Sequence, residues 1–490
     1  MDMIDVDRSP DRKGQHVYGE EENIMSNGEK NIDTMMVRFG MRVADWCEKW
    51  FPDALVFAIL AVFIVYIAGL FLGNSPMKLA VMFGTGFWSI IPFTMQMVLI
   101  IVGGYLLASS PPVYRCVKWL AAFPQTPRGA IVYVAAISML SSLIHWGFCL
   151  IFSGFLVREI CVRIKNIDYR AMGAAAFLGG GSIWTLGLSS SAAMMMATKG
   201  SVPPDLYKIC GFIPLTHTLF TWQNWTLAAI IFAVSLLICY LTAPTKGQGH
   251  TSEDYGIDLE PLVVKTAPRK TPGEWFEYSP VVTILMAAIA FAYLYYLLDT
   301  KGIIAALDLN TLNFFFIMLA LLLHWRLRSF VEAAVGGVKA STGVLIQFPF
   351  YGAILVMITK SGVSDVIAKF FVAISNVDTF PVLAGAYSAV LGLVVPSAGG
   401  KWLIEAPYIL AAANTLQIHQ GWVVQIYNAA EAIPNLINPF WMLPLMGLLK
   451  MKAREMVGYS AVQCIFHIPV ILFLCWFFSK TFTYVPPIFP

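Results

Sequence analysis

The polar motifs of this chain occur twice, once in each half of a largely apolar sequence. Residues 141–146 and 397–402 both fit the pattern Ser-x-x-x-(His/Lys)-Trp. Upstream of each motif lies a matching Gly-x9-Gln pair, Gly86 with Gln96 and Gly337 with Gln347. An apolar chain that is built twice, with polar residues at corresponding places, is typical of secondary transporters.

Downstream of each motif the apolar sequence is interrupted again, around 187–191 and around 434–439. Non-helical backbone at membrane depth leaves N–H and C=O groups unpaired unless protein or a water-filled site satisfies them. Half-helix N-termini carry partial positive charge and exposed N–H donors, which favour an anion such as a carboxylate. The residues that we expect to bind substrate lie at these tips and breaks: Ser141, Ser142, His145, Ser189, Ser190, Ser191, Ser397, Gly399, Gly400, Lys401 and Asn438.

Two of these residues, Lys401 and His145, are basic. Each could attract an anionic substrate; alternatively both face water at the tip, or His145 is an interior hydrogen-bonding residue. Glu405, one turn past Lys401, is placed to form an ion pair with it. Because desolvation cancels much of the gain from a buried ion pair, we expect uncharged donors to dominate and Lys401→Ala to have a mild effect. Three tryptophans are candidates for an apolar wall, or else for interface anchors: Trp146, Trp184 and Trp402.

Glu431 lies well inside an apolar span, where an ionisable side chain is costly and therefore functional by default. Asn428 and Asn435 lie one turn away on either side, so three side-chain oxygens share one helical face beside a break. With Thr185, these residues are the candidate site of a coupling ion, Na+ or H+, between which the sequence does not decide. A structural pairing of Glu431 with a neighbouring Asn or backbone donor is the alternative. No other metal and no cofactor is expected.

The composition indicates a membrane protein. The chain is 58% hydrophobic and only 12% charged, against roughly 25% charged residues in a soluble domain. Its net charge of +3 gives no reason to expect a nucleic-acid partner. The eight cysteines have neither the spacing of a disulfide framework nor that of a zinc site. The expected surroundings are therefore a lipid bilayer.

Polar stretches divide the chain. Residues 1–34 are polar, without the early apolar core of a signal peptide, and predict a disordered extension. Residues 244–275 predict a cytoplasmic linker between a first repeat, 35–243, and a second repeat, 311–490, with a connecting helix in 276–310. The apolar runs are 53–73, 84–109, 222–243, 279–298, 311–325, 340–360 and 461–480, with broken helices at 171–198 and 422–449 and polar-tipped hairpins at 129–162 and 381–416.

The expected fold is an all-α polytopic membrane protein with about nine transmembrane helices plus two re-entrant hairpins. The short arms of each hairpin favour re-entry over two full crossings. Every loop assigned to the cytoplasm is richer in Lys and Arg than any loop assigned outside, which places the N-terminus in the cytoplasm and the C-terminus outside. Span 84–109 then runs inward and span 340–360 outward, so an inverted-topology repeat is predicted.

Three runs resemble a known family: Val395–Trp402, Asn428–Asn435 and Gly187–Ala192. They are similar to the bacterial short-chain fatty acid transporter family, within a larger superfamily of two-hairpin ion transporters, and the resemblance covers residues 36–485. It implies a homodimeric inner-membrane carrier of small monocarboxylates such as butyrate or acetoacetate, with a scaffold domain, a moving transport domain and elevator-type alternating access. The Ser-Asn-Thr tips of the dicarboxylate branch are absent, so the resemblance does not transfer that branch's ion ligands.

Other functions stay open at this point. A carrier of dicarboxylates or another organic anion would share the same fold and the same breaks. A membrane-embedded acyltransferase would need a nucleophile or a His-rich cluster, and the sequence has no His-x4-Asp pattern. A passive channel would show rings of charge or a filter motif.

The hairpins can be tested by labelling. If 129–162 and 381–416 re-enter the membrane, single cysteines at Ile144 and Ala398 should react with a water-soluble maleimide only through an aqueous cavity, each from its own side. Full crossings at these segments would contradict the inverted repeat.

Overall fold

The computed structural model describes residues 54–489 apart from 199, 245–248, 260–268 and 396, and its regular elements are helices. The expected extension 1–34 and much of the linker 244–275 lie outside the described residues. In chain order the helices are α3 (Ala54–Phe71), α4 (Pro76–Phe87), α5 (Ile91–Ala108), α6 (Pro111–Leu120), α7 (Pro127–Ile144), α8 (Trp146–Arg163), α9 (Tyr169–Leu178), η1 (Gly179–Ile183), η2 (Trp184–Leu186), α10 (Ser191–Ala197), α11 (Pro204–Cys210), η3 (Leu215–His217), α12 (Trp222–Thr242), η4 (Glu253–Tyr255), α13 (Trp275–Tyr278), α14 (Pro280–Lys301), α15 (Ile303–Ala306), α16 (Leu309–His324), α17 (Leu327–Lys360), α18 (Val363–Ile374), α19 (Phe380–Val394), α20 (Ala398–Thr415), α21 (Gln420–Asn435), η5 (Pro439–Met442), α22 (Leu443–Leu449) and α23 (Ala453–Ser479).

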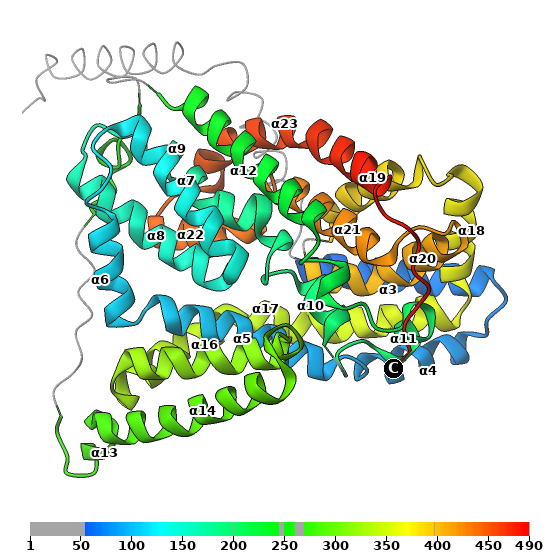
Figure 1. Cartoon of the computed structure of the whole chain (residues 1–490), viewed down its shortest axis with the longest axis horizontal. Coiled ribbons are helices and arrows are strands. Elements are labelled where there is room, and N and C mark those ends of the chain that lie inside the picture. Colours follow the sequence, from blue (N-terminus) through cyan, green and yellow to red (C-terminus); the bar gives the residue numbers. More distant parts are fainter. Residues whose placement is uncertain (1–53, 199, 245–248, 260–268, 396, 490) are drawn as a thin grey trace, which may run out of the picture.

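One layer of the molecule is built on α17, a helix of 34 residues (Figure 1). It packs along α3, α4 and α5, while α16 packs on α5 and α14 packs on α16. A separate apolar cluster joins α5 to α16 and contains Val98, Val102, Leu106, Phe316 and Ala320. We call this set of helices the α17 layer.

The other layer contains the four interrupted segments. Helices α7 and α8 form one hairpin and α19 and α20 form another; the broken helices run from α9 to α10 and from α21 to α22. Helices α12 and α23 pack against them. We call this set the hairpin layer. It meets the α17 layer where α8 packs on α5 and where α20 packs on α17.

Both hairpins turn at a residue that caps the second arm. His145 has φ −157° and ψ 104°, and Ser397 has φ −153° and ψ 102°. Nδ1 of His145 accepts a hydrogen bond from the N–H of Phe148 at 3.2 Å. Oγ of Ser397 accepts one from the N–H of Gly400 at 3.2 Å. The two breaks are therefore equivalent in backbone conformation and in capping, which satisfies one of the unpaired donors at each helix start.

This equivalence corrects the alignment of the two sequence motifs. His145 is the residue at its break, whereas Lys401 lies one turn inside α20. The residue that occupies the place of Lys401 in the first hairpin is Cys149, which follows its cap by the same interval. The pattern Ser-x-x-x-(His/Lys)-Trp therefore matches residues that do not superimpose, since Ser141 lies inside α7 whereas Ser397 caps α20.

The broken helices end for different local reasons. In the first, three consecutive glycines begin a π-helical turn, Gly179–Ile183, which passes into η2. A single π-helical turn of this kind is frequent at functional sites. In the second, α21 ends at Asn435, directly after Pro434, whose missing N–H ends the hydrogen-bond ladder. Both breaks fall within the predicted segments 171–198 and 422–449.

Seven helices of the described residues are long and apolar enough to cross a membrane, whereas the sequence predicts about nine. The predicted span 311–325 is a shorter helix, and α7, predicted as a hairpin arm, meets the length criterion. The run 84–109 is divided between α4 and α5. The run 340–360 is the C-terminal part of a helix that begins at Leu327, and Arg328 and Glu332 form an ion pair at 2.7 Å on the surface of its first turns.

The repeated glycines mark helix crossings. A Cβ on Gly86 of α4 would lie 2.8 Å from Cβ of Val356 and 2.9 Å from the carbonyl oxygen of Gly352 on α17. A Cβ on Gly337 of α17 would lie 3.0 Å from Cα of Val102 on α5. Small residues at such positions let two helix backbones approach closely.

We expect Gly86→Ala to lower the melting temperature of the purified protein, because overpacking a tight contact costs about 1–3 kcal/mol. Gly84→Ala is the matched control on the same helix, since a Cβ there would meet nothing within 4 Å. Equal melting temperatures for the two variants, measured in detergent, would show that the α4–α17 crossing is not tight.

Candidate functional site

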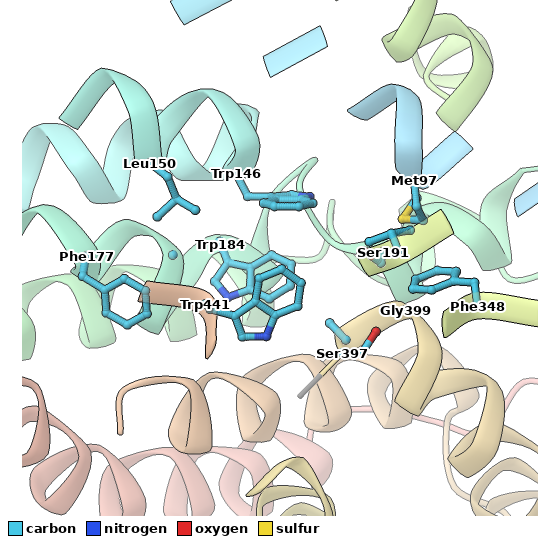
Figure 2. A pocket seen from close by; sticks show the side chains of 13 residues that line it. Met97, Trp146, Leu150, Phe177, Trp184, Ser191, Phe348, Ser397, Gly399 and Trp441 are labelled. Atoms are coloured by element: carbon cyan, nitrogen blue, oxygen red, sulfur yellow. The ribbon is translucent and has the colours of Figure 1, made fainter. Parts of the chain in front are cut away.

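A narrow cavity lies where the hairpin layer meets the α17 layer, and its volume is about 30 Å³. Figure 2 shows side chains from both hairpin tips, both broken helices, α5 and α17 converging on it. The lining residues are Met97, Trp146, Leu150, Phe177, Gly180, Trp184, Ser191, Val344, Phe348, Ser397, Ala398, Gly399 and Trp441. None of these lining residues is charged, so the cavity combines an aromatic and aliphatic wall with a few uncharged polar groups.

Three tryptophans form one side of the cavity (Figure 2). The ring of Trp146 lies 6.2 Å from that of Trp184 and 5.7 Å from that of Trp441, measured between centroids. The indole nitrogens of Trp146 and Trp184 are buried and have no hydrogen-bond partner among the described residues. A buried N–H without an acceptor is costly, so these two donors favour a ligand that can accept a hydrogen bond. The sequence offers Trp146 and Trp184 as apolar wall or as interface anchors, and not as hydrogen-bond donors.

The start of α20 reaches the opposite side of the cavity. Ser397, Ala398 and Gly399 all line it. Because Ser397 caps the N–H of Gly400, the N–H groups of Ala398 and Gly399 are the ones that helix geometry leaves without a helical acceptor. Gly399 is closely approached by the α17 layer, since a Cβ there would lie 3.2 Å from the ring of Phe93.

Several residues predicted to bind substrate bond instead to the protein. Ser141 donates to the carbonyl of Ser138 at 2.9 Å and Ser142 to that of Met139 at 2.7 Å, both within α7. Ser189 donates to the carbonyl of Ser142, which joins the first hairpin to the first break. His145 is buried and its ring packs edge-on against Phe316 at 4.6 Å. These residues hold the cavity walls and do not line the cavity.

A polar chain joins the two broken helices. Ser190 donates to Oδ1 of Asn428 at 3.0 Å, and Thr185 donates to the carbonyl of Asn428 at 2.7 Å. Nδ2 of Asn428 donates to Gln425 at 2.7 Å, and Gln425 in turn donates to Asn224 of α12. All five residues are buried. Thr185, Ser190 and Asn428 therefore lock the broken helices together.

Lys401 lies in a second buried group of side chains, beyond the cavity. Its Nζ lies 2.6 Å from Oε2 of Glu431 and 3.8 Å from Oε2 of Glu405. It donates to the carbonyl and to the hydroxyl of Ser388 at 2.7 and 2.8 Å, and it lies 4.5 Å from the ring centroid of Tyr427. The side chain is 0% exposed. The alternative in which Lys401 faces water at the tip is therefore wrong, and its ammonium is directed away from the cavity.

The three oxygens expected on one face of α21 do not form a single site. Glu431 approaches Lys401 with Oε2, and its Oε1 has no hydrogen-bond partner among the described residues. Asn428 is bound by the first broken helix, and the side-chain atoms of Asn435 have no partner in the described chain. Asn438 follows the break and is 6% exposed, outside the cavity lining. The helix has the predicted periodicity, but each side chain is directed by the element that packs on it.

Three residues were missed by the sequence analysis. Ser388 lies in the middle of the apolar helix α19, where one serine is usual and gives no signal of function. Tyr427 packs on Lys401 and on Trp402, at 4.7 Å between ring centroids, so Trp402 does not line the cavity. Trp441 contacts Trp146 and does line it. The sequence signal that could have identified Trp441 is its position just after the interruption at 434–439.

We expect Lys401→Met to destabilise the protein strongly, by about 3–5 kcal/mol, because it leaves two buried carboxylates without their cation. This expectation concerns the stability of the fold, whereas the mild effect predicted from the sequence for Lys401→Ala concerns substrate binding. Lys369→Met, at an exposed lysine of α18, is the control. Thermal unfolding in detergent measures the difference, and adding Glu431→Leu to Lys401→Met should recover part of the loss. A melting temperature for Lys401→Met equal to that of the control would contradict a structural role of the pair.

The sequence and the fold were compared with known proteins. Residues 35–478 match the profile of the family described as "Short chain fatty acid transporter". A protein of Escherichia coli (strain K12), provisionally named a short-chain fatty acid transporter, is 32% identical over 438 residues, which are 88% of this chain and 97% of that protein. A Haemophilus influenzae (strain ATCC 51907 / DSM 11121 / KW20 / Rd) protein with the same provisional name is 30% identical over 454 residues, 90% of this chain and 100% of that protein.

Two solved structures share the fold. The Alcanivorax borkumensis YdaH transporter aligns with a TM-score of 0.55 at 14% identity, over 88% of this chain and 98% of that chain. Neisseria gonorrhoeae MtrF, from a class of antimetabolite efflux pumps, aligns with a TM-score of 0.57 at 13% identity, over 92% of this chain and 100% of that chain. Both neighbours are transporters, and the apolar helices of this chain agree with a multi-pass membrane protein. The chain belongs to the short-chain fatty acid transporter family.

Proposed function

We propose that this protein is a cation-coupled secondary transporter of short-chain monocarboxylates, such as butyrate or acetoacetate, in the bacterial inner membrane. The observation that carries the proposal is the cavity between the layers: an apolar, aromatic chamber into which both hairpin tips and the first broken helix bring uncharged donors. Its family and its provisionally named relatives support the same substrate class.

The substrate carboxylate is held by uncharged donors. The candidates are the hydroxyls of Ser191 and Ser397, the first N–H groups of α20, and the indole N–H groups of Trp146 and Trp184. The positive end of the α20 dipole favours an anion at this place. Because no lining residue is charged, the acid binds without a full ion pair and release is correspondingly easier.

The hydrocarbon tail of the acid lies against the apolar side chains of the cavity wall. Met97 and Phe348 come from the α17 layer, and Leu150 and Phe177 come from the hairpin layer. Ligand sites are usually apolar with a few placed polar groups, and the composition of this wall suits a short apolar tail. The cavity of about 30 Å³ has to widen to admit the acid. A dicarboxylate would have to place a second charge against this wall, which makes it the less favoured substrate class.

Transport requires the cavity to open alternately to the two sides of the membrane. We assign that motion to the hairpin layer, sliding against the α17 layer in an elevator-type cycle within a homodimer. The contact between the layers includes close backbone approaches at glycines: a Cβ on Gly104 of α5 would lie 2.7 Å from the backbone of Gly147 on α8. The N-terminus is assigned to the cytoplasm and the C-terminus to the periplasm, by the excess of Lys and Arg in the loops assigned inside.

Uptake of an anion against a membrane potential needs a compensating cation, since each uncompensated charge costs about 2.3 kcal/mol per 100 mV. The buried polar groups at the second break, including Glu431 and Asn435, are the elements available for coupling. The residues that line the cavity are compatible with either Na+ or H+ as the coupling ion.

We expect Trp184→Phe and Trp146→Phe to weaken butyrate binding while preserving the wall, because each removes one N–H donor. The loss of a hydrogen bond to a charged group, about 1.5–3 kcal/mol, corresponds to roughly ten- to hundred-fold in affinity. Trp119→Phe, at an exposed tryptophan of α6, is the control. Counterflow of labelled butyrate into proteoliposomes, corrected with protein-free vesicles and competed with unlabelled butyrate or succinate, measures the effect. Counterflow supported by succinate and not by butyrate would contradict the proposed substrate class.

A further inference from the structure

Four side chains form a sealed polar group next to the substrate cavity, which we call the Lys401 cluster: Lys401, Glu405, Glu431 and Ser388. The side chains of Lys401 and Glu431 are 0% exposed and that of Glu405 is 1% exposed. Ser388 is fully buried on α19. Gly392 of the same helix covers the ion pair, since a Cβ there would lie 3.2 Å from Oε2 of Glu431 and 3.5 Å from Nζ of Lys401.

The charges of this cluster do not balance when every group is ionised. It holds one ammonium and two carboxylates, so its net charge would be −1 in an interior that water does not reach. An uncompensated buried charge is strongly unfavourable. Binding one proton makes the cluster neutral, and two carboxylates that share one cation therefore take up and release a proton as a unit.

The geometry identifies the carboxylate that takes the proton. Glu431 approaches Lys401 at 2.6 Å, whereas Glu405 lies 3.8 Å from the same ammonium and accepts a hydrogen bond from Ser388 at 3.1 Å. The closer ion pair stabilises an ionised Glu431. Glu405 has a weaker interaction with the ammonium than Glu431 has. It is therefore the carboxyl that holds the proton when the cluster is neutral.

Among the residues that the structure describes, the surroundings of Glu405 supply no second cation. The tyrosines around it come from α19, α20 and α21, and α17 places Tyr351 against Gly400. Charged residues on the neighbouring helices α11 and α18 are paired with each other or exposed at the surface, and α10 has no ionisable side chain. The titratable groups around Glu405 and on the helices packed against α20 are Lys401, Glu431, Tyr387, Tyr408, Tyr427, Tyr351, Asp205, Lys208, Lys360, Asp365 and Lys369.

The cluster and the cavity share one helix. Ser397 and Gly399 line the cavity at the start of α20, and Lys401 and Glu405 follow on its next turns. Tyr427, which packs on Lys401, donates a hydrogen bond to the carbonyl of Ala398 at the cavity wall. A change in the position of the hairpin tip on substrate binding therefore also changes the spacing of the charges.

We propose that Glu405 is the proton-carrying residue of transport, so that the coupling ion is H+ and the cycle moves one monocarboxylate anion with one proton. The carboxylate of Glu405 takes a proton from the water on the side from which the anion enters, the neutral cluster crosses with the loaded cavity, and the proton returns to water on the other side. The inference rests on the proposed function, and it selects between the two coupling ions that the cavity leaves open.

The test separates exchange from net transport in proteoliposomes. In Glu405→Gln the side chain is permanently neutral, like the protonated carboxyl, so the loaded carrier should still exchange labelled for unlabelled butyrate at equal pH and equal concentration. Net uptake requires release of the proton and return of the empty carrier, so it should fall to the rate of protein-free vesicles. A gradient of one pH unit, which drives about tenfold accumulation in a one-to-one symporter, should give no stimulation above those vesicles in the variant. Glu332→Gln, at an exposed glutamate of α17, is the control.

The outcomes distinguish the inference from the proposed function. If Glu405→Gln keeps proton-driven uptake, or if a sodium gradient and not a proton gradient drives the wild type, the role of Glu405 is wrong while monocarboxylate transport stands. If the wild type does not exchange butyrate or acetoacetate, the proposed function itself is wrong.

A second variant decides the matter if Glu405→Gln does not fold. Ser388→Ala removes the hydroxyl that donates to Glu405 and so disfavours its ionised form. The pH at which proton-driven uptake is half-maximal should then move upward relative to the wild type. An unchanged midpoint in Ser388→Ala would overturn the assignment.

Discussion

Helices that stop inside an apolar interior leave backbone N–H groups without acceptors, and the rest of this structure is arranged around satisfying them. His145 and Ser397 cap the two hairpin breaks through the same backbone conformation. Ser190 both caps α10 and binds Asn428 on the other broken helix. Because an unpaired buried donor is costly, these caps stabilise the helix starts, and the cap at Ser190 also joins the two broken helices. The cavity lies among them, and the donors left uncapped are the ones that remain for a ligand.

The start of α20 illustrates how one local feature serves two purposes. Ser397 caps the N–H of Gly400 and leaves the N–H groups of Ala398 and Gly399 for the cavity. The next turns of α20 place an ammonium and a carboxylate in the buried interior. The glycines at its tip allow aromatic rings of the α17 layer to approach, so the tip is both polar and closely packed. The proposed recognition of the substrate anion and the burial of the Lys401 cluster therefore both depend on the placement of a single helix.

The positions of most helices and of their breaks could be predicted from the sequence, because the length and hydropathy of a segment determine whether it can span an apolar layer. The interruptions in 129–162, 171–198, 381–416 and 422–449 all appear as breaks between helices. The directions of the functional side chains could not be predicted in the same way. Lys401 has a long flexible stem, so its place near a tip does not fix the position of its ammonium, and its partner Ser388 comes from another helix. Two tryptophans predicted as wall proved to carry unpartnered donors, a property that only the packing of their neighbours decides.

The two halves share their backbone design but not their charges. Where the second half places Lys401 against Glu431, the first half places Cys149 against Gly179, a pair of small uncharged residues. In an inverted repeat of identical halves, the conformations open to either side would be related by the two-fold axis in the membrane plane and would have equal free energy. An ion pair confined to one half removes that degeneracy. The empty carrier would then rest preferentially on one side of the membrane for reasons of its own chemistry, even where no gradient exists.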